Sequence, residues 1–240
     1  MKTANRLVSI FGVLIFSIGA FMGIVLEGSA VWGDLEAFMF VKPLGADKSF
    51  KGLSCPVMIS ENENSQVTAT LKNATDQPIQ QTIRTHLSSY YTSLVDQVDT
   101  KIPLEPGEEK EMVWPINPDD ALYGRFYLVR VYAFATYKTP SREGSCGVMV
   151  VSLPYTGRLI VTFLLIGSIL GMVLGIITWV LMRREMSNQS NEAIYAMGAM
   201  AGIVLIGIFV SFVGWWFAGM IILILIILMA GSMIARYLLS

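Results

Sequence analysis

Few side chains in this chain are of the types that perform chemistry on a bound substrate. His86 is the single histidine, and in Thr85-His86-Leu87 it alternates with apolar residues, a pattern typical of a strand with its imidazole on the polar, solvated face. No nucleophile elbow and no glycine-rich phosphate loop accompany it. The sequence therefore predicts no catalytic residue, and we expect a protein that is not an enzyme.

Residues that could bind a metal ion are equally sparse. One histidine and two distant cysteines supply no ligand cluster. Asp119 and Asp120, which follow Asn117-Pro118, are the densest set of oxygen ligands and form either a loose calcium site or an ordinary turn. The turn is the expected outcome, so we predict neither a metal nor any other cofactor.

The two cysteines, Cys55 and Cys146, lie near the two ends of the polar middle of the chain. Their surroundings, SCPVMI and SCGVMV, look alike, and each opens a short apolar strand. If these strands lie side by side and parallel, the two sulfurs start at one level. A disulfide is expected in an oxidising compartment, and two buried free thiols are the alternative.

Four apolar stretches without Asp, Glu, Lys, Arg or His surround this polar middle. Each has about 20 residues or more, which is what a helix needs to cross roughly 30 Å of hydrocarbon. Their freedom from ionisable groups argues against ion or proton transport by this chain alone. The expected transmembrane helices are 7–26, 159–182, 193–212 and 215–235, and the polar domain is 33–156.

Charges flanking the apolar stretches predict the orientation in the plasma membrane. Cytoplasmic flanks are enriched in Lys and Arg, and such residues precede the first stretch, follow the second and end the fourth. Both termini are therefore expected in the cytoplasm and the polar domain outside. The charged residues that carry this prediction are Lys2, Arg6, Arg183, Arg184 and Arg236.

The first apolar stretch is either an uncleaved anchor or a signal peptide with a small-residue cleavage site at 28–30. Its length exceeds the apolar core of typical signal peptides, which favours the anchor. Residues 33–156 hold 11 Lys and Arg against 15 Asp and Glu, and the remainder 6 against 3. No basic stripe interleaved with aromatics occurs, so nucleic-acid binding is excluded.

The polar domain carries the signals of about seven short strands. Residues 67–71 alternate between apolar and polar, and Ile79 opens a second strand. Residues 98–104 and 112–114 flank a Pro-Gly turn and are expected to pair as a hairpin. Residues 126–136 form the longest and most central strand. Alternation in Trp32–Lys42 predicts one more strand, or a stalk.

Three segments in this order, VTATLKNATDQP, IPLEPGEEKEMVW and YGRFYLVRVYAF, resemble extracytoplasmic immunoglobulin-like domains of the cell-adhesion-related (CARDB) kind in bacterial and archaeal cell-surface proteins. The resemblance covers about residues 53–153. Like the number and spacing of the strands, it implies an all-β immunoglobulin-like sandwich, which the order of the apolar stretches places between transmembrane helices 1 and 2. The chain departs from that pattern in its cysteine pair and in being threaded between spans.

Glycines recur at a spacing of four in three of the apolar stretches, which lets helix backbones approach closely. The triple in the second stretch is the strongest signal, because single pairs also arise from the high glycine content of membrane helices. The partner helices belong either to this chain or to another protein. The predicted packing glycines are Gly19, Gly23, Gly167, Gly171, Gly175, Gly198 and Gly202.

Aromatic residues with one arginine gather in the polar domain, a composition typical of protein interfaces. Core packing is the alternative and is expected to claim about half of them. The candidate interaction surface consists of Tyr90, Tyr91, Arg130, Tyr132, Phe134 and Tyr137.

The sequence thus predicts a membrane-anchored extracytoplasmic binding or scaffold protein, in contact with membrane lipid and with another membrane or cell-surface protein. One alternative is an accessory subunit of a multi-protein membrane complex, such as a transporter or a respiratory assembly. Another is a membrane-embedded enzyme, whose interfacial pocket would be lined by Glu27, Trp32, Tyr155 and Arg158.

Overall fold

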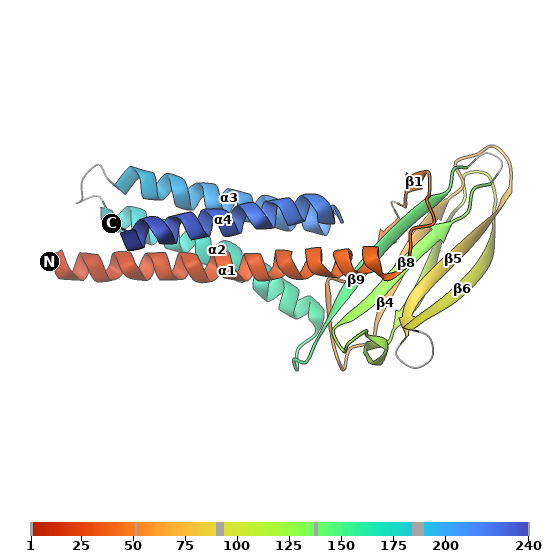
Figure 1. Ribbon diagram of the computed structural model, residues 1–240, viewed down its shortest axis with the longest axis horizontal. Helices are drawn as coiled ribbons and strands as arrows, with labels where there is room; N and C mark the ends of the chain where they lie inside the picture. Colours follow the sequence, from red (N-terminus) through yellow and green to blue (C-terminus); the bar gives the residue numbers. More distant parts are fainter. Residues whose placement is uncertain (1, 51, 90–93, 137–138, 184–189, 240) are drawn as a thin grey trace. The chain divides into compact units, whose positions relative to one another are not determined.

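The chain forms two units, each described here by itself. The helical unit comprises residues 1–31 and 161–240, and the β unit comprises residues 32–160. The computed structural model (Figure 1) describes residues 2–50, 52–89, 94–136, 139–183 and 190–239.

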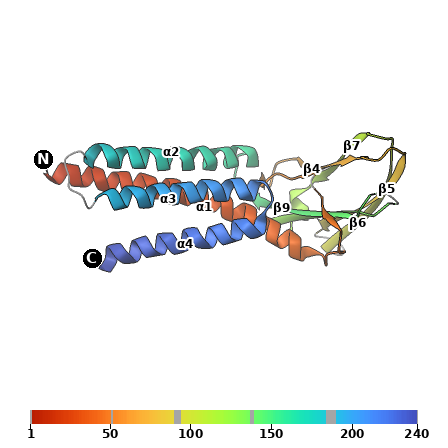
Figure 2. The ribbon, with the colours of Figure 1, turned by 90° about the horizontal axis from the view of Figure 1, so that it is seen from above.

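Four helices follow the apolar stretches of the sequence (Figures 1 and 2). They are α1 Lys2–Phe40, α2 Gly157–Arg183, α3 Ser190–Phe212 and α4 Trp216–Leu239. Within the described residues, α1, α2 and α3 each contain a segment long and apolar enough to cross a membrane. The described apolar part of α4, Trp216–Ser232, is shorter. Three membrane-length helices are therefore present, and the fourth span stays a prediction.

Helix α1 continues without a break as far as Phe40, so the strand or stalk predicted for residues 32–42 is wrong. The alternation of apolar residues there also fits a helix, since the segment contains no proline and several good helix formers. Ala30, Gly33 and Ala37 are buried, and this spacing of three and four residues is the helical period. A short apolar segment is ambiguous between the two periods.

Helices α1 and α2 approach each other with glycine on both sides. A Cβ atom placed on Gly171 would lie 2.7 Å from Gly19 Cα, and one on Gly175 would lie 2.6 Å from Phe16 Cβ. Backbones this close leave no room for a larger side chain. The predicted packing glycines with a neighbour within 3 Å are Gly19, Gly23, Gly167, Gly171 and Gly175.

Gly198 and Gly202 on α3 have no packing neighbour among the described residues, so their packing against another protein stays a prediction. Among the described residues, nothing lies within 4 Å of a Cβ placed on either glycine. Helix α3 contacts α1 through other positions, because Val204 lies against Gly23 and Gly207 against Glu27. The four-residue spacing alone does not tell which face of a helix meets a neighbour.

Replacing Gly171 by leucine is expected to lower the stability of the helical unit by about 2 kcal/mol, because the new side chain must displace the Gly19 backbone. Thermal unfolding of the detergent-purified protein measures the loss. Gly202→Leu is the matched control, since its surroundings within the chain are open. Equal destabilisation by both substitutions would contradict the close contact between α1 and α2.

The described residues of the β unit contain nine strands in two sheets. One sheet has the order β1-β9-β8-β5-β6, with β3 also pairing with β9, and the other has the order β2-β4-β7. The strands are β1 Lys48–Ser49, β2 Leu53–Ser54, β3 Met58–Ser60, β4 Ser65–Lys72, β5 Ile79–Ser89, β6 Leu94–Leu104, β7 Glu109–Ile116, β8 Phe126–Ala133 and β9 Arg142–Val151.

The two sheets enclose one apolar core. Val67 and Trp114 contribute to it from the smaller sheet, and Ile83, Val129 and Val148 contribute from the larger sheet. Strand β8 is central, as predicted, but it has 8 residues and is shorter than β5 and β6 with 11 each. The prediction that it is the longest strand is wrong.

The predicted hairpin between β6 and β7 does not form. Strand β6 pairs with β5, and β7 pairs with β4 in the other sheet. The turn between them is present, because Glu108 N donates to Glu105 O at 3.0 Å and Gly107 has φ +77°. It carries the chain from one sheet to the other. Apolar patterning locates strands and turns, but pairing depends on contacts distant in sequence.

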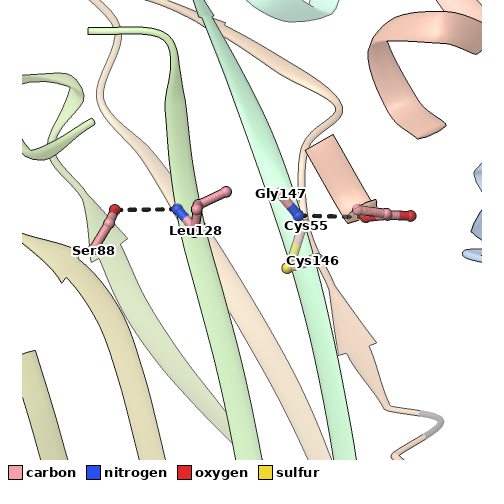
Figure 3. The surroundings of a disulfide bond; sticks show 6 residues. Cys55, Ser88, Leu128, Cys146 and Gly147 are labelled. Carbon is pink, nitrogen blue, oxygen red and sulfur yellow. Dashed lines mark hydrogen bonds between the residues drawn. A yellow bond between two sulfur atoms is a disulfide. The ribbon is translucent and has the colours of Figure 1, made fainter. Parts of the chain in front are cut away.

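A disulfide joins Cys55 to Cys146, with the two Cα atoms 6.4 Å apart (Figure 3). The strand β3 that follows Cys55 pairs with β9 in parallel, with Met58 opposite Met149. The matching sequences around the cysteines therefore do lie side by side. The crosslink ties the start of the β unit to its last strand.

Candidate functional site

The outer face of the larger sheet carries a row of polar and aromatic side chains. Tyr127, Val129 and Val131 of β8 point into the core, so Arg130 and Tyr132 between and beyond them face outward. The adjacent strand β5 places His86 opposite Arg130 and Arg84 opposite Tyr132. These cross-strand pairs follow from the register of β5 and β8.

Arg130 is the centre of this face and is only 2% exposed. Its Nη1 lies 3.1 Å from Glu143 Oε1 on β9, and its Nη2 donates to the backbone oxygen of Phe38 at 2.6 Å. Burial lowers the pKa of Arg130 from its ordinary value, while the Glu143 carboxylate acts in the opposite direction. The Glu143 carboxylate thus favours the charged form of the buried Arg130 guanidinium.

The C-terminal end of α1 covers this face, which explains the burial. The Phe38 ring centroid lies 5.9 Å from Arg130 Cζ. Asp34 accepts a hydrogen bond from Gly147 N at 3.3 Å, and a Cβ atom placed on Gly33 would lie 2.9 Å from Gly147 O. Two glycines therefore allow the helix backbone to rest on β9.

The row continues toward β6 with an exposed ion pair. Arg84 Nε and Nη2 donate to the two carboxylate oxygens of Asp99, each at 2.8 Å. Arg84 Cζ lies 5.2 Å from the Phe134 ring centroid, and Tyr132 meets Phe134 edge to face at 4.8 Å. The Arg84 hydrogen bonds lower the pKa of Asp99 and raise that of Arg84.

His86 is buried beneath this row, so its predicted solvation is wrong. It is 7% exposed, and its Nε2 lies 3.3 Å from Gln97 Oε1. Among the described residues, His86 Nδ1 and Arg130 Nε have no hydrogen-bond partner. Because the two residues are cross-strand neighbours, a small polar group between them could satisfy both atoms. When His86 Nε2 donates to Gln97 Oε1, His86 Nδ1 is an acceptor and Arg130 Nε a donor, so such a group must both donate and accept, as a hydroxyl group does.

The predicted interaction surface is correct in one respect and wrong in another. Arg130, Tyr132 and Phe134 do gather on one face of the sheet. However, Arg130 and Tyr132 are buried and Phe134 is half-buried, and the end of α1 covers Arg130 instead of forming a strand. The remaining members, Tyr90, Tyr91 and Tyr137, lie outside the described residues.

Two further predicted sites are the Asp119–Asp120 pair and the alternative interfacial pocket. Asp119 and Asp120 form a short 3-10 helix capped by Asn117, whose side chain accepts from Asp119 N at 3.3 Å. The part of the chain that is described holds no group of three or more metal-ligating side chains. The four residues of the alternative interfacial pocket fall into different units, with Glu27 in the helical unit and Trp32, Tyr155 and Arg158 in the β unit.

The sequence analysis named Glu27 only as a lining residue of the alternative interfacial pocket and missed its burial within a helix. It directly follows the first apolar stretch, but α1 continues past it for 13 residues, and the carboxyl group is fully buried. The signal was the continuing apolar and helix-forming sequence after it. The expectation that the spans lack ionisable groups therefore needs correction at this position.

The fold defines a chain of apolar, membrane-length helices that carries an all-β unit between its first and second helix. No protein-family model and no curated protein matches the sequence. Among solved structures, the CARDB domain of the PF1109 protein of Pyrococcus furiosus, in complex with di-metal ions, is similar. It has 14% identity and a TM-score of 0.33, and the match covers 43% of this chain and 92% of that domain.

Two glycosidases also contain a similar part. β-Glucuronidase of Bacteroides uniformis has 16% identity and a TM-score of 0.28, over 41% of this chain and 12% of the enzyme. β-Glucosidase of Listeria innocua in complex with glucose has 20% identity and a TM-score of 0.29, over 42% of this chain and 16% of the enzyme. This chain thus spans a small fraction of either glycosidase.

Proposed function

We propose that the protein is a membrane-anchored binding or scaffold protein, whose β unit is an extracytoplasmic immunoglobulin-like sandwich of the CARDB kind that binds another membrane or cell-surface protein. The three membrane-length helices support the anchoring. The flanking Lys and Arg residues support a cytoplasmic location of both termini. The disulfide supports an oxidising compartment for the β unit.

The observation that carries the binding role is the exposed side chain of Tyr123. It is 87% exposed and has φ 55°, the one described non-glycine residue with a positive φ. A bulky residue in this conformation costs on the order of 1 kcal/mol. The turn holds it there, because Leu122 N donates to Phe126 O at 2.8 Å and Gly124 N to Ala121 O at 3.1 Å.

An exposed aromatic ring on a rigid turn is well suited to anchor a protein interface. Tyrosine is enriched among residues that dominate binding energy, since it buries a large area with little loss of side-chain entropy. The backbone around Tyr123 gains nothing from the aromatic side chain, because glycine suits its φ better. A contact with a partner would account for this combination.

Replacing Tyr123 by glycine is expected to raise the stability of the β unit by about 1 kcal/mol, because the strain is relieved. Recovery of the partner should fall at least about tenfold if the ring is worth 1.4 kcal/mol or more in the interface. Thermal unfolding gives the first quantity, and quantitative mass spectrometry after purification in mild detergent gives the second.

A photo-crosslinking amino acid at position 123 identifies the partner directly. Ala135 is the control site, since it is exposed and lies beyond the opposite end of β8. Adducts with one membrane or surface protein from position 123, absent from position 135, support the proposal. Equal adducts at both sites, or none with any protein, contradict it. Stoichiometric co-purification with several integral subunits would instead favour the accessory-subunit alternative.

A further inference from the structure

The helical unit contains a carboxyl group that the proposed binding role does not use. Glu27 lies on α1 and is 0% exposed. Among the described residues, neither of its carboxyl oxygens has a hydrogen-bond partner. Ionisable side chains within membrane-spanning helices are costly, and where they occur they mark functional sites.

Helix α3 packs directly against this carboxyl group. A Cβ atom placed on Gly207 would overlap both Glu27 oxygens, so only glycine leaves space for them. One turn earlier on α1, Gly23 faces Val204 of α3 and Ser168 of α2. The described neighbour of the carboxyl group is therefore the Gly207 position of α3, and an apolar side chain and a hydroxyl group lie one turn earlier.

Two buried hydroxyl groups flank Glu27 along the helices. A Cβ placed on Gly23 would lie 2.6 Å from Ser168 Oγ, and one placed on Gly219 would lie 2.8 Å from Ser211 Oγ. Gly23 is one turn before Glu27, and Ser211 is one turn after Gly207, about 6 Å along each axis. Neither hydroxyl has a hydrogen-bond partner among the described residues.

An ionised Glu27 would need a neutralising charge, because an unpaired buried carboxylate costs several kcal/mol. Among the described residues, Gly207 of α3 packs against the carboxyl group, and Ser168 of α2 and Ser211 of α3 lie about one turn along the helices; none of the three is titratable in the pH range of a carboxyl group. Arg6 of α1 lies 21 residues away, about 30 Å along the helix.

The neutralising species can be a metal cation or a proton, and the geometry favours the proton. Hard metal cations require about six oxygen ligands arranged around them. Here the carboxyl oxygens meet the Gly207 backbone, and the serine hydroxyls lie a turn away on either side. A proton needs only one oxygen atom.

We propose that Glu27 is a proton-binding site within the helical unit. The carboxylic acid is the resting form, because the described residues give its oxygens no partner that would stabilise a carboxylate. This inference is independent of the binding role of the β unit, because it concerns residues of the helical unit alone.

The test uses the full-length protein in native membranes and the apolar reagent N,N′-dicyclohexylcarbodiimide. This reagent adds a protonated carboxyl group across its C=N bond: the carboxyl oxygen bonds to carbon, the proton moves to nitrogen, and acyl migration gives a stable N-acylurea with no leaving group. Mass spectrometry should locate the adduct on Glu27. Labelling should fall about tenfold for each pH unit above the midpoint of titration.

Matched reagents and variants separate the possible outcomes. Glu27→Gln should abolish the adduct at this position, while a water-soluble carbodiimide should modify the exposed Glu105 and spare Glu27. Infrared spectra of the parent should contain a protonated-carboxyl band that is missing from Glu27→Gln. If sodium ions protect Glu27 from labelling at constant pH, the site binds a metal cation and the proposal of a proton site is wrong. Absence of both the adduct and the band at every pH would overturn the proposal.

Discussion

Replacing Glu143 by glutamine is expected to destabilise the β unit by about 3 kcal/mol, because Arg130 then remains buried without its counter-charge. Arg130 is 2% exposed, and its Nη1 lies 3.1 Å from the Glu143 carboxylate. The amide keeps the size of the side chain and one acceptor, so the change isolates the charge. Thermal or urea unfolding of the purified protein measures the loss.

The Arg84–Asp99 pair provides the matched control on the same face of the sheet. Its side chains are 29% and 43% exposed, so Asp99→Asn should cost much less stability than Glu143→Gln, because solvent screens an exposed pair. Because Arg84 lowers the pKa of Asp99, this small contribution is present at neutral pH. It is lost as the pH falls through the lowered pKa of Asp99. Equal losses from the two substitutions would contradict the special burial of Arg130.

Replacing both Cys55 and Cys146 by serine is expected to lower stability by about 4 kcal/mol, because the crosslink closes a loop of 91 residues in the unfolded chain. The strands that follow the two cysteines also pair directly, so the folded arrangement itself should survive. A reducing agent should lower the unfolding temperature of the parent protein and leave that of the double variant unchanged.

Alkylation before and after denaturation checks the covalent state of the two cysteines. A disulfide protects both thiols from alkylation under either condition until a reducing agent is added. Two thiols that react once the protein is denatured, without reduction, would show that the cysteines are free. In that case the double serine substitution should have only the small effect of a packing change.

Elements with a strong local pattern were predictable from the sequence. The apolar stretches of the first three helices and the alternation in β4 depend on residues close together in the chain, and both appear where expected. The disulfide was also predictable, because the two cysteines lie in similar sequences and parallel pairing of β3 with β9 brings these sequences side by side. Each of these inferences uses only periodicity and short-range context.

Predictions that depended on which surfaces meet were less successful. The glycine spacing on α1 and α2 marks a real contact, but the same spacing at Gly198 and Gly202 marks none among the described residues. Likewise, the sequence of strand β7, which follows the Pro-Gly turn, allows it either to pair with the preceding strand β6 or to join another sheet. Both outcomes satisfy the same local preferences, and the larger number of tertiary contacts decides between them.

The sequence by itself determined the membrane-length helices, the strand-rich segment between the first two and the paired cysteines, because these follow from composition and short periodic patterns. Only the tertiary structure placed the end of α1 over the larger sheet, which made Arg130 a buried residue instead of a surface residue. It also placed Gly207 against Glu27. Burial is the result of contacts between distant segments, and a single residue's type does not reveal what will cover it.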